Sequence, residues 1–79
     1  MQIEVLAFAH LREQLGFSTR MVECSEDQTP RDLLAVIAPD FSLDNSIRVA
    51  VDREYGDWDK PVGCAFEIAF IPPVSGGSA

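Results

Sequence analysis

Residues 65–77 read AFEIAFIPPVSGG and carry the clearest structural pattern in the chain. The stretch 65–71 is apolar apart from one glutamate, which is typical of a strand in the interior of a sheet. The two prolines that follow end this strand, because proline has no N–H to donate to a neighbouring strand. Residues 72–79 carry no side-chain charge and no large side chain. The sequence therefore predicts a folded domain over residues 1–71 and a flexible C-terminal tail over 72–79.

A second strand of the same kind begins the chain. Ile3, Val5 and Ala7 alternate with other residues over 2–9, which is the period of a strand with one buried face. Between the two strands, the apolar spacing predicts a short helix over 10–15, a strand over 19–24, the main helix over 30–38, a strand over 47–52 and a short strand near 53–55.

Local residues support the helix boundaries. Gly16 stands where a helix-ending glycine belongs, and Thr29 and Pro30 suit the cap and first position of the main helix. The order of elements favours an α+β domain, in which one main helix packs on one face of a mixed sheet. If the first and last strands pair in parallel in the middle of that sheet, the arrangement is the β-grasp of ubiquitin-like proteins.

Composition and charge narrow the possible partners. The chain has 79 residues, of which 47% are hydrophobic, so it can form one small core. The net charge of −7 would be repelled by nucleic acid and by anionic membrane surfaces, and neither is expected as a partner. A basic protein partner is favoured by this charge, although the acids can equally serve solubility alone.

Metal and redox sites are not expected. His10, Cys24 and Cys64 are too few and too far apart in the sequence for a zinc site. The chain starts without a basic signal-peptide region and has no long apolar run, so we expect a cytoplasmic protein with reduced thiols. Each cysteine is interpreted as a small buried or half-buried residue, and His10 and Trp58 as structural or surface residues.

The alternation predicts an exposed apolar patch on the sheet. Leu6 and Phe8 face away from the core side of the first strand, and Ala69 and Ile71 do so in the last strand. The opposite, core-facing set is Phe66, Ile68 and Phe70 in the last strand, together with Ile3, Val5 and Ala7 in the first. One helix covers only one face of a sheet, so the patch is expected to bind a partner. A covering loop or a bulge that reverses the register would remove it.

The tail has two interpretations on composition alone. Its prolines impose an extended exit and its glycines are slim, so the segment could pass through a narrow channel to a remote site. A frayed terminus has the same composition.

Two motifs resolve this choice. FAHLRE at 8–13 and FIPPVSGG at 70–77 resemble the small subunit of molybdopterin synthase, that is, the MoaD-like sulfur carriers. The Thr29-Pro30 helix start and the strand VAVD at 49–52 also fit, so the similarity extends over essentially the whole chain. The ending PPVSGG is fairly specific for this group, whereas Gly-Gly alone would indicate only a ubiquitin-like protein or a sulfur carrier.

The resemblance implies a β-grasp fold and a cycle with two protein partners. A ubiquitin-activating-type adenylyltransferase would use ATP to adenylate the carboxylate of Gly77, and sulfur transfer would convert it to a thiocarboxylate. The tail would then insert into the large synthase subunit, which turns cyclic pyranopterin monophosphate into the dithiolene of molybdopterin. The family implies one carrier at each end of a dimeric large subunit, a heterotetramer. No bound cofactor or metal is expected on the carrier itself.

The resemblance assigns roles to residues of this chain. Gly77 would carry the sulfur, Gly76 would provide the slimness needed in the channel, and the catalytic groups would belong to the partners. The motifs and the face argument together predict that the partners bind Leu6, Phe8, Arg12, Ala69, Ile71, Pro72, Pro73, Val74 and Ser75. By motif position Phe70 would join this set, but the alternation places it in the core. Arg12 could instead be a solvated helix residue.

The chain departs from the family pattern at its end, because Ser78 and Ala79 follow Gly77. Two extended residues move a carboxylate about 7 Å beyond Gly77, so we hypothesise that they are removed, by a dedicated peptidase or adventitiously. Two other functions remain open. One is a carrier for thiamine, cysteine or thionucleoside synthesis, and the other is a ubiquitin-like modifier conjugated through Gly77, many of which are made with a masked Gly-Gly.

Overall fold

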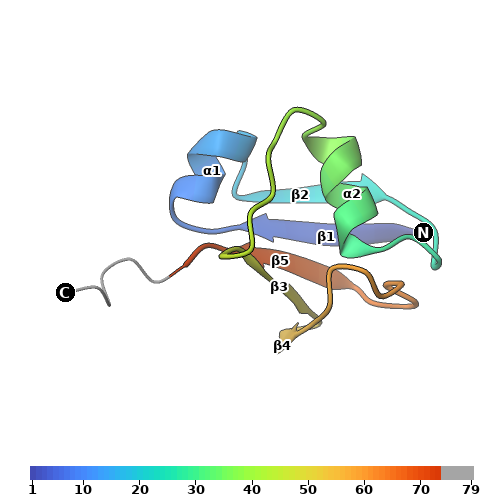
Figure 1. Ribbon diagram of the computed structural model, residues 1–79. Coiled ribbons are helices and arrows are strands. Elements are labelled where there is room, and N and C mark those ends of the chain that lie inside the picture. Colours follow the sequence, from blue (N-terminus) through green and yellow to red (C-terminus); the bar gives the residue numbers. More distant parts are fainter. Residues whose placement is uncertain (74–79) are drawn as a thin grey trace.

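The structure is a computed structural model, and it describes residues 1–73 (Figure 1). Its elements are the strand β1 (Gln2–Ala7), the helix α1 (His10–Leu15), the strand β2 (Thr19–Glu23), the helix α2 (Pro30–Ile37) and the strands β3 (Arg48–Val51), β4 (Glu54–Tyr55) and β5 (Glu67–Ile71). Each predicted element is present, and the boundaries differ from the expected ones by at most two residues.

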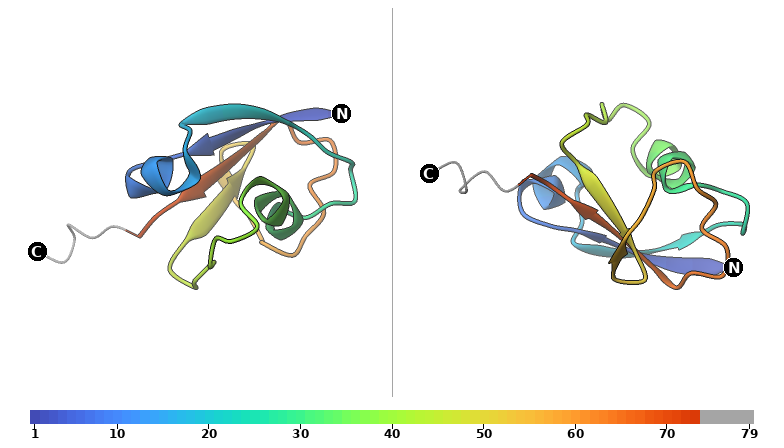
Figure 2. Two further views of the ribbon diagram at one scale, coloured as in Figure 1. Left: turned by 90° about the horizontal axis from the view of Figure 1, so that it is seen from above. Right: turned by 60° about the horizontal axis from the view of Figure 1, so that its bottom comes forward.

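The five strands form one mixed sheet in the order β2-β1-β5-β3-β4. The two terminal strands β1 and β5 lie in parallel at its centre, and all other pairs are antiparallel. Both helices lie on the same side of the sheet, so its other face has no helix over it (Figures 1 and 2). This confirms the predicted α+β class and the β-grasp arrangement.

Both helices have the termini that the sequence predicts. The Thr29 hydroxyl accepts a hydrogen bond from the N–H of Asp32 at 3.1 Å, and the Asp32 carboxylate accepts one from the N–H of Thr29 at 3.0 Å. This reciprocal capping box satisfies two backbone donors at the start of α2. Gly16 ends α1 at φ 89°, a left-handed conformation that glycine adopts without a steric penalty.

The core lies between the sheet and the two helices. Its fully buried side chains come from the alternating positions of β1, from β3 and β5, and from the inner faces of the helices: Ile3, Val5, Leu11, Leu33, Val49, Ile68 and Phe70. Trp58 packs against this core from the loop after β4. Its ring stacks on Phe70 with centroids 5.5 Å apart, and its Nε1 donates to the carbonyl of Ile47 at 3.0 Å, which supports the predicted structural role.

The start of β5 differs from the prediction. The expected strand over 65–71 begins only at Glu67, and Phe66 is 59% exposed rather than part of the core. Asp52 explains this difference, because its Oδ1 accepts the N–H groups of Phe66 and Glu67 at 2.8 and 3.0 Å. A carboxylate thus binds the N–H groups at this end of β5, while the Phe66 carbonyl still accepts the N–H of Glu4 in β1 at 2.9 Å.

Asp52 itself belongs to a two-residue turn instead of the predicted strand over 47–52. Asp52 and Arg53 both have positive φ, 52° and 72°, and join β3 to β4. Two central residues at positive φ match the twist of an antiparallel hairpin. The short strand expected near 53–55 is therefore the second arm of this hairpin.

The two cysteines occupy different environments. Cys24 is buried, as predicted, and burial raises the pKa of its thiol. Cys64 is exposed, so the expectation that it is buried or half-buried is wrong: it lies in a surface turn before β5, where its Sγ is 3.7 Å from Oε2 of Glu26. Both thiols are free. Among the described residues, no helix has the length and apolar character needed to cross a membrane.

Candidate functional site

The tail leaves the domain from the central strand of the sheet. β5 ends at Ile71, which is half-buried, and Pro72 is buried while Pro73 is exposed. Two flanking strands therefore hold the point where the tail begins. The other tail residues assigned a function, Val74, Ser75, Gly76 and Gly77, and the two after them, Ser78 and Ala79, lie outside the described residues.

The predicted apolar patch is partly present on the face without helices. Leu6 of β1 pairs with Ala69 of β5, so the two positions lie side by side on this face. Leu6 and Ile71 are half-buried, and Phe8 is 46% exposed. We call Leu6, Phe8 and Ile71 the docking patch, because these three offer apolar surface beside the base of the tail.

Ala69 does not offer such surface, and the expectation that it is exposed is wrong. It is only 4% exposed, although it is on the predicted face of β5. Its register partners are Leu6 on one side and Ala50 on the other, and a methyl group between two paired strands projects too little to present apolar surface. Phe70 is 1% exposed, so the alternation was the correct guide to this side chain.

Sequence reasoning missed two exposed side chains on the outer strands. Met21 of β2 is 55% exposed, and Tyr55 of β4 is 71% exposed. The guanidinium of Arg48 lies 5.8 Å from the centre of the Tyr55 ring, a cation–π arrangement. The face without helices thus carries large side chains on its edge strands as well as at its centre.

The opposite end of this face is acidic. Glu4 pairs in register with Glu67, so two carboxylates occupy neighbouring positions of the central strands. Glu67 is only 7% exposed, and its nearest cation is Arg53, with Nε 3.6 Å from Oε1. This ion pair is longer than a hydrogen bond, and the Arg53 side chain is 80% exposed. The face therefore combines an apolar end beside the tail with an acidic end at the start of β5.

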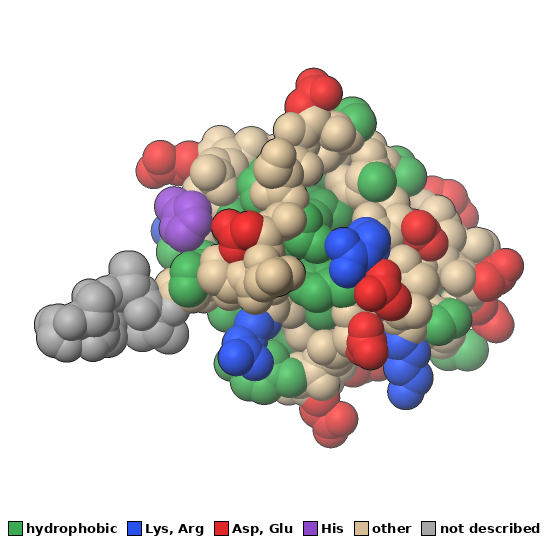
Figure 3. Space-filling view, viewed as in Figure 1, with side chains coloured by type: hydrophobic (Ala, Val, Ile, Leu, Met, Phe, Trp, Pro, Cys, Tyr) green, Lys and Arg blue, Asp and Glu red, His purple; other side chains and the backbone are tan. Residues whose placement is uncertain are grey.

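Charged groups also surround the base of the tail on the helix side. Arg12 is exposed on α1, its Nε lies 3.5 Å from the carbonyl oxygen of Ala9, and it takes part in none of the ion pairs within residues 1–73. In the loop before β3, Ser46 donates its hydroxyl and its N–H to the Asp44 carboxylate, which lowers the pKa of Asp44. Figure 3 shows acidic and basic side chains next to an apolar centre on this face.

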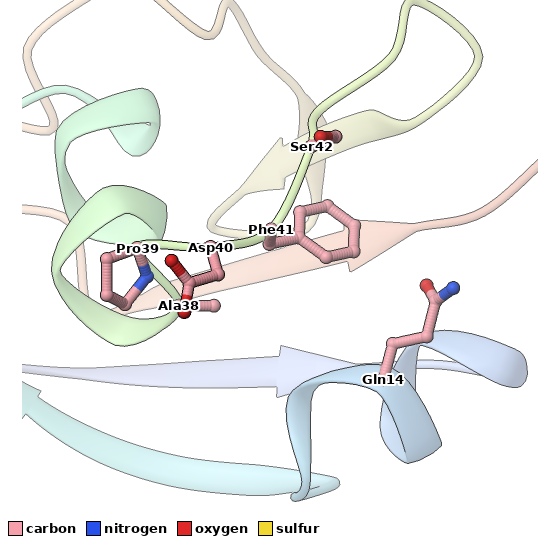
Figure 4. A pocket seen from close by; sticks show the side chains of 6 residues that line it. All are labelled: Gln14, Ala38, Pro39, Asp40, Phe41 and Ser42. Atoms are coloured by element: carbon pink, nitrogen blue, oxygen red, sulfur yellow. The ribbon is translucent and has the colours of Figure 1, made fainter.

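An open groove beside α1 lacks the groups of a catalytic site. It has a volume of about 520 Å³ and lies between α1 and the loop that follows α2 (Figure 4). Its lining residues are Gln14, Ala38, Pro39, Asp40, Phe41 and Ser42. One carboxylate without a histidine, cysteine or cation beside it does not make an acid–base pair or an activated nucleophile. Within residues 1–73, no three His, Cys, Asp or Glu side chains gather in a way that could hold a metal ion.

Comparison with known proteins agrees with the resemblance in the sequence. Residues 5–77 match the model of the ThiS family. The chain is 35% identical to the molybdopterin synthase sulfur carrier subunit of Chlamydomonas reinhardtii over 83 aligned positions, which cover 98% of this chain and all of that protein.

Solved structures agree as well. The crystal structure of SAMP1 from Haloferax volcanii matches with a TM-score of 0.78 and 29% identity, and the match covers 98% of this chain and all of that one. A putative molybdopterin converting factor, subunit 1, from Pyrococcus furiosus matches with a TM-score of 0.74 over 94% of this chain and 99% of that one. Its 23% identity supports the fold alone. The chain therefore has the ubiquitin-like β-grasp fold and belongs to the ThiS family.

Proposed function

We propose that this protein is the sulfur carrier subunit of molybdopterin synthase and that Gly77 carries the sulfur. The observation that supports this most strongly is the 35% identity to a molybdopterin synthase sulfur carrier subunit along nearly the full length of both chains. The exit of the tail from the central strand, beside the docking patch, suits a protein whose body is bound while its end reacts elsewhere.

The chemistry needs a free carboxylate at Gly77. A carboxylate oxygen attacks the α-phosphorus of ATP on the activating partner, pyrophosphate leaves, and an acyl-adenylate forms. A sulfur nucleophile at the oxidation level of hydrosulfide then attacks the acyl carbon; a C–S bond forms, the C–O bond breaks and AMP leaves. The resulting thiocarboxylate is a sulfur nucleophile without a side chain beside it, because Gly76 and Gly77 have none.

The large synthase subunit would supply the remaining groups. The thiocarboxylate sulfur bonds to a carbon of cyclic pyranopterin monophosphate while a C–O bond at that carbon breaks and its oxygen leaves as phosphate oxygen or water. Water then cleaves the acyl–sulfur bond, so the sulfur stays on the pterin and the carrier returns as a carboxylate. A dithiolene holds two sulfur atoms and each carrier brings one, so each product molecule requires two charged tails. An assembly with one carrier at each end of a dimeric large subunit, a heterotetramer, is the proposed form.

Ser78 must be removed before this cycle can begin. It follows Gly77, so the carboxyl group of Gly77 is part of a peptide bond. Hydrolysis of that bond by a peptidase would release the carboxylate. The intact mass of protein isolated from its native cells tests this step, because an active carrier that retains Ser78 and Ala79 would overturn it.

Reconstitution tests the function. The chain ending at Gly77 is prepared as a thiocarboxylate and mixed with the cognate large subunit and cyclic pyranopterin monophosphate. We expect molybdopterin to form in proportion to the thiocarboxylate added, and none to form with the carboxylate form or with a chain that ends at Gly76. Failure of the two proteins to associate would overturn the proposal, and product from another sulfur-accepting pathway would identify a carrier for that pathway.

A protein modifier is the second candidate, and one observation favours it. SAMP1 of Haloferax volcanii, the small archaeal modifier protein 1, is 29% identical to this chain, and its structure matches with a TM-score of 0.78. In that function the activated Gly77 carboxyl group would form amides with lysines of other proteins. A ladder of high-mass conjugates in native cells, lost when Gly77 is deleted, would support this candidate over the first.

A further inference from the structure

Primary amines are scarce on this protein. The chain has six basic residues, and only Lys60 among them is a lysine. The other five are arginines, whose guanidinium groups stay protonated and do not act as acyl acceptors. An activated Gly77 carboxyl group therefore meets only two primary amines on another copy of the chain, the side chain of Lys60 and the α-amino group of Met1.

The α-amino group of Met1 is occupied by other contacts. It donates hydrogen bonds to Oε2 of Glu23 at 3.0 Å and to the carbonyl oxygen of Cys24 at 2.9 Å. Both acceptors lie on or next to β2, which pairs with β1 along its length. Attack by this amine on a carbonyl carbon would require both hydrogen bonds to be given up first.

Lys60 is placed differently. It is exposed in the segment between β4 and β5, and none of the ion pairs within residues 1–73 includes it. Next to it is an open groove of about 260 Å³, and its other lining residues are Val51, Glu54, Tyr55, Gly56, Asp57, Pro61 and Val62. The Gly-Gly end has no side chains, so it could approach the amine along this open groove, where the Glu54 and Asp57 carboxylates also lie.

The position of Lys60 favours transfer between copies. Lys60 shares its groove with Val51, which pairs with Ile68 near the start of β5, whereas the tail begins after the other end of that strand at Ile71. Figure 1 shows this segment and the start of the tail at opposite ends of the sheet. The tail of one molecule and the lysine of another can therefore meet without either domain unfolding.

We propose that Lys60 is the acyl-acceptor site of this protein, at which the activated Gly77 carboxyl group of a second copy forms an isopeptide bond. The Lys60 amine attacks the acyl carbon of the adenylate; a C–N bond forms, the C–O bond breaks, AMP leaves and one proton goes to solvent. This inference rests on the proposed function only in requiring an activated Gly77. It predicts that covalent multimers of this protein contain a single type of linkage, from Gly77 of one copy to Lys60 of the next. This holds whether the multimers arise as a side reaction of sulfur transfer or as a product of conjugation.

The acceptor can be tested without the activating enzyme. The chain ending at Gly77 is prepared as a C-terminal thioester and incubated alone at high concentration, so that aminolysis releases only the small thiol. We expect covalent dimers and longer species whose isopeptide bond mass spectrometry assigns to Lys60. Lys60→Arg keeps the charge and is expected to lower the dimer yield at least tenfold, leaving hydrolysis of the thioester.

A matched variant provides the control. Arg53 is 80% exposed in the hairpin turn, so Arg53→Lys adds one amine at the same end of the molecule and is expected to restore dimers in the Lys60→Arg background. Linkage through Met1, an undiminished dimer yield in Lys60→Arg, or a cyclic monomer as the main product would each overturn the proposal.

A second arm separates this inference from the proposed function. Here the activating enzyme and ATP replace the thioester. The exchange of labelled pyrophosphate into ATP is measured, because this exchange reports adenylate formation. Activation of Gly77 without linkage at Lys60 would overturn the inference and leave the proposed function intact. Absence of activation would count against the proposed function, and the thioester arm would still decide whether Lys60 is the acceptor.

Discussion

Glu4 and Glu67 are register partners in the central parallel strands, so two carboxylates lie side by side on the face without helices. Like charges at neighbouring positions of a sheet are unfavourable, and Glu67 is also 7% exposed. Arg53 is the one cation that forms an ion pair with either of them within residues 1–73, at 3.6 Å from Glu67. The pair of strands that holds the tail therefore includes an electrostatic repulsion.

Replacing one of these acids by a base should stabilise the domain. Glu4→Lys converts the repulsion into an attraction and is expected to raise the free energy of unfolding by about 0.5–1 kcal/mol, with Glu4→Gln in between. Urea unfolding at low salt measures this, and 1 M NaCl should reduce the difference because salt screens exposed charges. Equal stability of the three proteins at low salt would show that the two carboxylates do not interact.

The Asp52 carboxylate should contribute more to the stability of the domain than is usual for a side chain in a surface turn. It accepts two backbone N–H groups at the start of β5, and Asp52→Ala removes both acceptor contacts at a cost of about 2 kcal/mol in unfolding free energy. Asp52→Asn keeps an acceptor oxygen and tolerates positive φ, so it should lose less. Asp52→Gly separates the effect of positive φ from the loss of the acceptor, because glycine adopts positive φ without strain but has no acceptor oxygen. Wild-type stability of this variant would contradict the proposed role of the carboxylate as an acceptor for the two N–H groups.

Phe8 should matter for binding rather than for folding. Its side chain is 46% exposed in the docking patch, so Phe8→Asp is expected to weaken binding to the large synthase subunit at least tenfold while the melting temperature stays within a few degrees. Val36→Asp is the matched control, because Val36 is 65% exposed on α2 and lies on the helix side of the sheet. Unfolding of the Phe8 variant would show that this side chain belongs to the core.

Acid should weaken the contact between α2 and the segment after β4. Nε of Arg31 donates to Oδ1 of Asp59 at 2.7 Å, and this hydrogen bond lowers the pKa of Asp59. A lowered folded-state pKa contributes stability above the unfolded value, about 3.9, that is lost as the pH falls through the folded value. Asp59→Asn and Arg31→Gln should therefore both lose less stability than the wild type between about pH 5 and pH 2, as measured by urea unfolding. If the free energy of unfolding of both variants fell with pH as steeply as that of the wild type, this prediction would be wrong.

Local patterns were sufficient to predict most of the fold. Alternation identified the buried faces of β1 and β5, and Thr29 and Gly16 marked helix boundaries that depend on a few neighbouring residues. The late start of β5 involves Asp52 instead, which is 14 residues away in the sequence and accepts the N–H group of Phe66. Strand period cannot reveal such a contact.

For the candidate site, the sequence predicted which face of the sheet a side chain is on, but not how exposed that side chain is. The period of two placed Leu6 and Phe8 on the outer face, but it could not show that Ala69, a small side chain between two paired strands, is buried. Tyr55 was missed because β4 has only two residues, too few to show any alternation. Side-chain size and strand order together determine exposure, and strand order is a property of the whole chain.

The position of β5 also determines how the domain resists mechanical load. A force applied to the tail acts along β5, and the hydrogen bonds that join this strand to β1 and β3 lie across that direction. The load is therefore shared by both ladders in shear, and the bonds cannot be broken one after another from the end as in an unzipped edge strand. An unfolding machine that gripped the tail would have to break both ladders together, whereas a partner that only draws the tail into a channel leaves the domain folded.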